Sequence, residues 1–130
     1  MSRHEAIHRR RRIILNDDSA TMNDPSGYTE AGLLASPLGH ILDTQIDSIW
    51  WSIMTGADHL KFDSKVGDVG GKDPIPGAPK ADLKRFATVW RNIKAFMDRG
   101  GDPLKFVVDW GHGIGREGVA RYRLNMIQDS

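Results

Sequence analysis

The chain has 130 residues, of which 39% are hydrophobic, and its 18 Lys and Arg against 17 Asp and Glu give a formal net charge of +1. It has no cysteine, which excludes disulfide scaffolds, thiol nucleophiles and cysteine-ligated zinc. A nearly neutral chain also lacks the bulk field that would attract nucleic acid or an anionic membrane. The length and apolar content match those of one small domain with its own core.

The amino-terminal residues are basic. Four arginines at 9–12 are followed by only three apolar residues, so we find no hydrophobic region of a signal peptide in this chain. The localisation stays open, with a cytoplasmic protein as the default expectation. The longest apolar stretch, 46–54, is too short and too polar to span a membrane. We interpret residues 1–11 as a disordered basic tail and residues 12–130 as the folded domain. Because no basic or aromatic stretch elsewhere continues the arginine run, we expect no nucleic-acid binding and no membrane binding.

The first half of the chain predicts two buried strands separated by a broken helix. The β-branched run at 12–16 predicts the first strand, and polar residues at 19–29 predict a loop. Apolar spacing at 29–42 predicts short helical turns, with Thr29 as the cap and Pro37 as an interruption. The run at 46–54, which contains Trp50 and Trp51, predicts a second strand buried on both faces.

The second half predicts two helices and a third strand. Residues 61–80 hold too many glycines and prolines for regular structure, whereas 82–99 has the spacing of an amphipathic helix. Asp102 and Pro103 begin a further helix that ends between 111 and 115, and alternation at 119–125 predicts the third strand. Strands separated by helical segments indicate a parallel sheet in an α/β fold. The residues predicted for the buried stripe of the first of these helices are Leu83, Phe86, Trp90, Ile93 and Met97, broadened by Val89 and Phe96.

Two glycine-rich segments fail the tests for nucleotide binding. In the segment 66–73, Val66 stands where a phosphate loop needs its first glycine, and Asp73 replaces the hydroxyl residue that binds magnesium. The segment 111–116 has Arg116 in place of the third glycine of a dinucleotide fingerprint, and it precedes a strand instead of following one. The five histidines are scattered without the spacing of metal ligands. We therefore expect no cofactor and no metal.

Polar and aromatic residues gather where the predicted strands end. Ligands of parallel α/β folds bind outside the carboxyl ends of the strands, where the following loops meet. Carboxylates, an amide, a guanidinium and a flat indole suit a sugar, whose hydroxyls need polar partners and whose C–H face stacks on aromatic rings. Purely structural roles for the aspartates and the tryptophan are equally open. The candidate substrate-binding residues are Asn16, Asp17, Asp18, Trp51, Arg123, Asn125 and Asp129.

The order of several motifs resembles the amino-terminal part of poorly characterised, glycoside-hydrolase-like (β/α)8-barrel proteins of planctomycetes and related environmental bacteria. The resemblance is carried by residues 11–18, 44–49, 63–67, 102–104 and 123–129. It implies a barrel truncated after its third strand, contributing sugar-binding residues, while the catalytic pair would come from strands beyond residue 130. Met126 and Gln128 replace an acid and a histidine of the family pattern, so we expect the isolated chain to be inactive.

An alternative interpretation is a complete small α/β binding or interaction module without enzymatic activity. The two interpretations differ in the behaviour they predict. A barrel fragment should self-associate through its open sheet edges, whereas a complete module should be a monomer that unfolds cooperatively.

Overall fold

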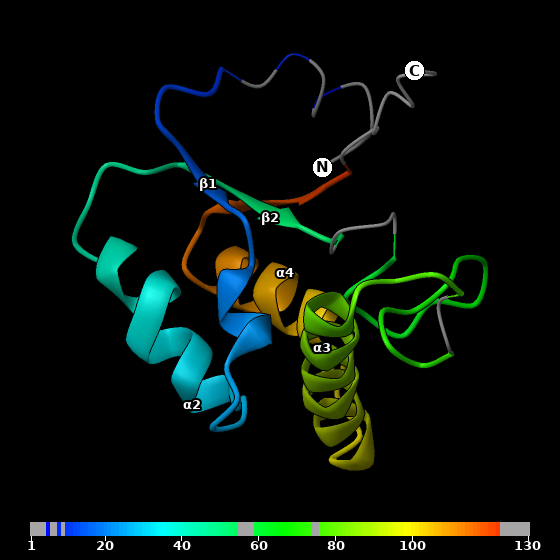
Figure 1. Ribbon diagram of the computed structural model, residues 1–130. Helices are drawn as coiled ribbons and strands as arrows, with labels where there is room; N and C mark the ends of the chain where they lie inside the picture. Colours follow the sequence, from blue (N-terminus) through cyan, green and yellow to red (C-terminus); the bar gives the residue numbers. More distant parts are fainter. Residues whose placement is uncertain (1–4, 6–7, 9, 55–58, 74–75, 123–130) are drawn as a thin grey trace.

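The computed structural model describes residues 5, 8, 10–54, 59–73 and 76–122, and it has a mixed α/β fold (Figure 1). The sheet consists of β1 (Ile14–Asp17), β2 (Ser48–Ser52) and β3 (Glu117–Arg121). The two long helices are α3 (Lys80–Asp98) and α4 (Pro103–Gly113), and both lie between β2 and β3 in the chain. Short helical turns fill the connection from β1 to β2: η1 (Ala20–Asn23), α2 (Glu30–Leu33), η2 (Leu34–Leu38) and η3 (Gly39–Ile41).

The three strands form an open, parallel sheet in the order β1-β2-β3, as the sequence predicts. Asp17 pairs with Trp51, and Trp51 in turn pairs with Ala120, so the carboxyl ends of all three strands lie at one edge of the sheet. The strand order follows the chain order. Both crossover connections therefore step in the same direction across the sheet.

Helices α2, α3 and α4 lie on the same side of the sheet (Figure 1). We call this side the helix face. It carries Leu15, Ile49 and Trp51, since a Cβ added to Gly118, which pairs with Ile49, would lie 3.1 Å from the Cα of Val108 in α4. Side chains alternate along a strand, so the neighbouring positions point the other way. This opposite face carries Ile14, Asn16, Ser48, Trp50, Ser52, Glu117, Val119 and Arg121.

A single hydrophobic core fills the space between the helix face and the helices. Apolar residues from every helical segment meet there with two residues of β2, and burying such side chains is the main stabilising contribution to a fold of this size. The buried residues of this core are Met22, Tyr28, Leu33, Leu38, Ile41, Ile49, Trp51, Val69, Val89, Ile93, Phe96 and Val107.

The first strand is less buried than the sequence predicts. Ile13 and Ile14 are 44% and 41% exposed, and β1 begins at Ile14 and ends at Asp17. The prediction of a buried strand was wrong because β1 is the first strand in the sheet order and its odd-numbered side chains alone face the helices. By contrast, four of the five residues of β2 are buried, as predicted for the central strand.

The connection from β1 to β2 contains more helix than predicted at its start. Residues 20–23 form the 3₁₀ turn η1 within the predicted loop. The cap at Thr29 is confirmed, because its hydroxyl oxygen accepts a hydrogen bond from the amide of Gly32 at 3.1 Å. The helix then passes into the π-helical turn η2, which includes Pro37, a residue without an amide hydrogen. The predicted broken helix is therefore confirmed.

The two long helices occupy nearly the predicted ranges, but the buried stripe of α3 is displaced. Leu83, the first predicted member, is 42% exposed, whereas Asn92 is buried. The buried stripe consists of Phe86, Val89, Asn92, Ile93 and Phe96. The stripe shifts because Asn92 packs toward η1, where its side-chain amide donates to the carbonyl groups of Met22 and Asp24.

Helix α4 begins and ends as the sequence predicts. The carboxylate of Asp102 caps it by accepting a hydrogen bond from the amide of Lys105 at 2.8 Å, and Pro103 occupies the first turn. Strand β3 then begins at Glu117, two residues earlier than predicted, and the predicted part at 123–125 lies outside the described residues. Among the described residues, no helix is long and apolar enough to cross a membrane.

Gly71 lets the glycine-rich segment after β2 pass close to α3. Its φ is +78°, and a Cβ at this position would lie 2.0 Å from the carbonyl oxygen of Phe86. Glycine therefore allows the loop to pass directly against the backbone of α3. The role of this glycine in the fold is close packing against α3.

Candidate functional site

A tight turn follows β1 at the carboxyl edge of the sheet, by which we mean the side where all three parallel strands end. Ser19 has φ 51° and is the one non-glycine residue with positive φ in the described part of the chain. Its amide donates to Oδ1 of Asp17 at 2.7 Å, and its hydroxyl lies 2.5 Å from the carbonyl oxygen of Ser52 at the end of β2. A serine in this conformation costs about 1–3 kcal/mol, so the surrounding contacts must hold it in place.

Lys61 supplies those contacts from the loop after β2. Its side chain is 4% exposed, and its ammonium nitrogen lies 2.9 Å from the hydroxyl oxygen of Ser19. The same nitrogen donates to the carbonyl oxygens of Asp18 at 3.0 Å and Ser19 at 3.4 Å. All three protons of the ammonium group are thus directed at the turn.

Burial and mutual attraction set the charges of this cluster. Burial lowers the pKa of Lys61 to about 8, against the opposing influence of the carboxylates of Asp17 and Asp18. Burial also raises the pKa of Asp17, although the hydrogen bond from the amide of Ser19 and the charge of Lys61 act in the other direction. Oδ2 of Asp17 is buried and has no hydrogen-bond partner among the residues that the structure describes. Asp17 and Lys61 therefore depend on each other for charge compensation.

The Ser19–Lys61 pair resembles the nucleophile and base of some hydrolases, but its geometry argues for a structural role. Ser19 is fully buried, so a substrate cannot reach its hydroxyl group. The hydroxyl oxygen accepts a hydrogen bond from the ammonium group, and the hydroxyl donates to the carbonyl oxygen of Ser52. A general base would have to accept the hydroxyl proton instead.

An ion pair connects the two outer strands across the carboxyl edge. The Nη2 atom of Arg121, at the end of β3, donates to Oδ1 of Asp18, which directly follows β1. The side chain of Asp18 is 78% exposed and that of Arg121 is 25% exposed. This pair brings together residues 103 positions apart in the chain.

The structure brings three of the seven predicted site residues together. Asn16, Asp17 and Asp18 lie at the carboxyl end of β1, where Asn16 is exposed on the opposite face. Trp51 is 1% exposed and belongs to the core, so its ring offers no surface to a ligand. This position matches the structural alternative for the tryptophan. Arg123, Asn125 and Asp129 lie outside the described residues.

Sequence reasoning missed three members of the cluster: Ser19, Lys61 and Arg121. Ser19 and Lys61 lie in segments that the sequence marks as loops, where such side chains are ordinarily solvated. Arg121 was predicted on the third strand but not at the site. The available signal was its position at the carboxyl end of a parallel strand, which is the same argument that selected Asp17 and Asp18.

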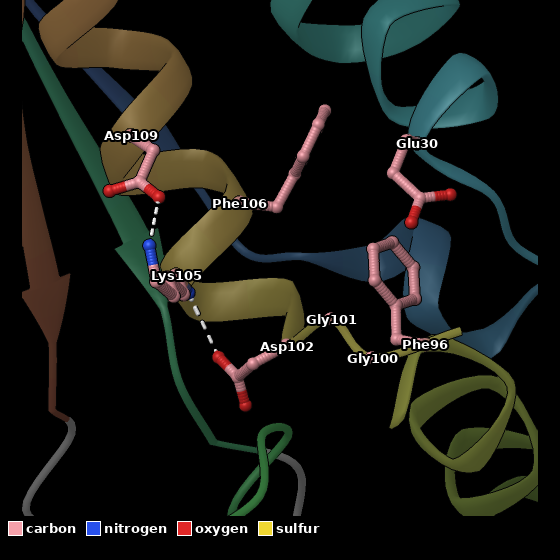
Figure 2. A pocket seen from close by; sticks show the side chains of 8 residues that line it. All are labelled: Glu30, Phe96, Gly100, Gly101, Asp102, Lys105, Phe106 and Asp109. Atoms are coloured by element: carbon pink, nitrogen blue, oxygen red, sulfur yellow. Dashed lines mark hydrogen bonds and ion pairs between the residues drawn. The ribbon is translucent and has the colours of Figure 1, made fainter. Parts of the chain in front are cut away.

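A separate pocket of about 230 Å³ lies between α2, the end of α3 and the start of α4 (Figure 2). Its carboxylates are already engaged. Glu30 pairs with Arg99 at 3.0 Å, Asp109 pairs with Lys105, and Asp102 caps α4 while also accepting from the amide of Asp63 at 2.9 Å. We therefore assign this pocket no ligand.

Neither a metal centre nor a known relative identifies the carboxyl edge. The part of the chain that the structure describes contains no group of three or more metal-ligating side chains. No protein-family model, no curated protein and no solved structure matches the chain. The function must therefore be inferred from the geometry of the carboxyl edge.

Proposed function

We propose that the chain is the first part of a carbohydrate-active, glycoside-hydrolase-like (β/α)8 barrel and that the carboxyl edge of its sheet binds sugar. The observation that carries the proposal is the Asp18–Arg121 ion pair, which places the exposed carboxylate of Asp18, directly after β1, beside the guanidinium group of Arg121 at the end of β3. The sequential strand order with α2, α3 and α4 on one side supports the barrel, because consecutive strand–helix units of a barrel wind in this way.

The charges at the edge favour a neutral sugar. Both cations are already used, since Lys61 is buried against the turn and Arg121 is paired with Asp18. The side chain of Asp18 is 78% exposed, and an anionic ligand would be repelled by its carboxylate. Carboxylate and amide oxygens are suitable partners for sugar hydroxyls. The polar contribution in this proposal comes from Asn16, Asp18 and Arg121. Asp17 does not contribute, because its Oδ1 accepts from the amide of Ser19 and its Oδ2 is buried. Arg123, Asn125 and Asp129 remain predictions.

A titration followed by ¹H–¹⁵N NMR tests the proposal. We would add methyl β-D-glucopyranoside, methyl β-D-galactopyranoside, xylotriose or D-glucuronate to the 130-residue protein. We expect a neutral sugar to shift the amide resonances of residues 16–19, 52 and 121, and we expect glucuronate to shift them less. Substituting Asp18→Ala should weaken binding about tenfold, which corresponds to ~1.4 kcal/mol.

The matched control is Asp43→Ala. Asp43 is also exposed but precedes β2, at the amino edge of the sheet, so its loss should leave the affinity unchanged. Amide resonances that stay fixed with every sugar would contradict the proposal. Equal losses of sugar affinity from Asp18→Ala and Asp43→Ala would also contradict it. Nitrophenyl glycosides should not be hydrolysed, because we assign no acid–base pair to this chain.

The continuous core favours a second candidate, a small binding module that folds alone. Every helical segment contributes to one cluster with β2, which is typical of an independent domain. Size-exclusion chromatography and thermal unfolding distinguish the candidates. A monomer that unfolds cooperatively supports the module, whereas association through the unpaired sides of the outer strands β1 and β3 supports the barrel fragment.

A further inference from the structure

We propose that Trp50, and not Trp51, is the surface on which a pyranose ring stacks at this site. The inference rests on the proposed function, and it names the aromatic contact and the part of the sugar that this contact recognises. A sugar presents one or both faces of its ring as C–H groups, and these pack on aromatic rings while the hydroxyls bind polar neighbours.

Trp50 lies on the opposite face of β2, away from the core. It pairs in register with Asn16 on β1 and with Val119 on β3. Its side chain is half-buried and does not belong to the core cluster, whereas Trp90 and Trp110 pack against that cluster. Among the four tryptophans, Trp50 therefore combines partial exposure with a position next to the candidate site.

A chain of hydrogen bonds holds the indole in one orientation. Its Nε1 donates to the hydroxyl oxygen of Ser48 at 2.9 Å, and this hydroxyl donates to Oε2 of Glu117 at 2.8 Å. Glu117 is itself held by the guanidinium group of Arg11, whose Nε donates to Oε2 at 2.5 Å. The polar edge of the ring is thus satisfied within the protein, so a ligand would meet the ring through its apolar faces. A ring fixed before binding also loses little conformational entropy when a ligand arrives.

Polar residues neighbour Trp50 in the sheet on two sides. Asn16, which is exposed, is its direct neighbour on β1. Ser52 and Arg121 form the next row on the same face, about 6.5 Å further toward the carboxyl edge. A sugar ring over Trp50 would thus have the amide of Asn16 at its side and the Asp18–Arg121 pair near its end. The arrangement combines an apolar platform with hydroxyl-binding groups.

The experiment uses the same NMR titration and follows the indole N–H resonances of the tryptophans. We expect methyl β-D-glucopyranoside or methyl β-D-galactopyranoside to shift the Trp50 signal while the Trp110 signal stays fixed. Sorbitol has hydroxyls but no flat ring, so it should leave the Trp50 signal in place. Trp50→Leu should weaken sugar binding about tenfold, or ~1.4 kcal/mol, and Trp50→Phe should retain most of the affinity.

Two further variants separate stacking from a structural role. Ser48→Ala releases the indole N–H but keeps the ring, so it should weaken binding less than Trp50→Leu does. Trp110→Phe changes an aromatic residue of α4 and should leave the affinity unchanged. If Trp50→Leu fails to fold, the Trp50 shift in the wild-type protein and the Ser48→Ala affinity decide the question.

Failure of the stacking role and failure of the proposed function give different results. Sugar binding that depends on Asp18 but is unchanged by Trp50→Leu, with no Trp50 shift, would overturn the stacking role and leave the proposed function intact. The absence of binding by every sugar would overturn both. A Trp50 shift with sorbitol equal to that with the glycosides would also exclude stacking, because an acyclic polyol has no ring to stack.

Discussion

The ammonium nitrogen of Lys61 lies 2.9 Å from the hydroxyl oxygen of Ser19, and this contact joins the loop after β2 to the turn after β1. It is the centre of a buried polar cluster that sets the shape of the carboxyl edge. The exposed groups proposed to bind sugar, Asn16 and Asp18, lie directly before this turn. The turn that follows them is therefore held by a lysine that lies 42 residues from Ser19 in the chain.

Replacing Lys61 by Met should destabilise the protein by about 1–3 kcal/mol at neutral pH, because the carbonyl groups of Asp18 and Ser19 lose their buried donor. Urea denaturation measures this change. The same substitution at exposed Lys65, in the same loop, is the control and should have little effect. Equal stabilities of the two variants would contradict the anchoring role of Lys61.

The pH dependence of stability gives a second test of Lys61. Its pKa is about 8 in the folded protein and 10.5 when unfolded, so between these values the unfolded chain holds a proton that the folded protein has lost. The free energy of unfolding should therefore rise with pH, by about 2 kcal/mol from about pH 7.5 to about pH 9.5. Lys61→Met should lack this rise.

This measurement is best ended below about pH 10. Burial raises the pKa of Tyr28, so the folded protein retains the phenol proton after the unfolded chain has lost it. That difference lowers the free energy of unfolding as the pH rises above 10.0, the ordinary pKa of a tyrosine. A fall in stability across the window of about pH 7.5–9.5 would contradict the buried position of Lys61.

The carboxyl groups of Asp17 and Asp24 should titrate on opposite sides of their ordinary pKa of 3.8. Burial raises the pKa of Asp17, whereas hydrogen bonds from Ser26 to the exposed Asp24 carboxylate lower its pKa. The ¹³C chemical shifts of the two carboxyl carbons, followed by NMR in one acid titration, measure both. Because its folded pKa is raised, Asp17 contributes stability below pH 3.8 that is lost as the pH rises through the folded pKa. An Asp17 midpoint below that of Asp24 would contradict the structure.

Asn92→Ala should destabilise the protein by about 1–3 kcal/mol. Asn92 is 1% exposed, and its side-chain amide donates to the carbonyl oxygens of Met22 at 2.9 Å and Asp24 at 3.0 Å. Truncation leaves both acceptors without this donor in the contact between α3 and η1. Lys84→Ala on the exposed side of the same helix is the control, and its midpoint in urea should differ little from that of the wild type.

Gly71→Ala should be more destabilising than Gly77→Ala. Both glycines have positive φ, +78° and +77°, so the backbone strain of an alanine, roughly 1 kcal/mol, is common to the two positions. At Gly71 the new Cβ would also lie 2.0 Å from the carbonyl oxygen of Phe86, whereas at Gly77 no atom lies within 4 Å. Thermal unfolding of the two variants isolates the cost of the clash, and equal midpoints would contradict the close approach to α3.

Local patterns predicted the elements of this fold because each boundary has a local cause. Thr29 and Asp102 cap their helices through hydrogen bonds to amides three residues ahead, and such contacts are readable from spacing. The exposure of Ile14 could not be predicted from the sequence, since it depends on the place of β1 in the sheet order. The displaced stripe of α3 likewise depends on the partners of Asn92 across the core.

The candidate site was predicted only where strand position was sufficient. Asp17 and Asp18 follow a parallel strand, and they lie at the expected edge. Alternation along β2 indicates that Trp50 and Trp51 point to opposite faces of the sheet. Only the positions of the helices show which of these faces packs against the core. Lys61 could not be predicted at all, because its partners belong to a turn separated from it by about 42 residues and by an entire strand.

The Arg11–Glu117 pair has a consequence for the order of folding. These residues are 106 positions apart, and their contact can form only after β3 has docked beside β2. Helices α3 and α4 are built from local contacts, whereas both strand pairings close long stretches of chain, which is the slower kind of event. In pulsed hydrogen exchange we therefore expect the amides of α3 and α4 to become protected first. The indole of Trp50, anchored through Ser48 to Glu117, should reach its native environment only in the final step.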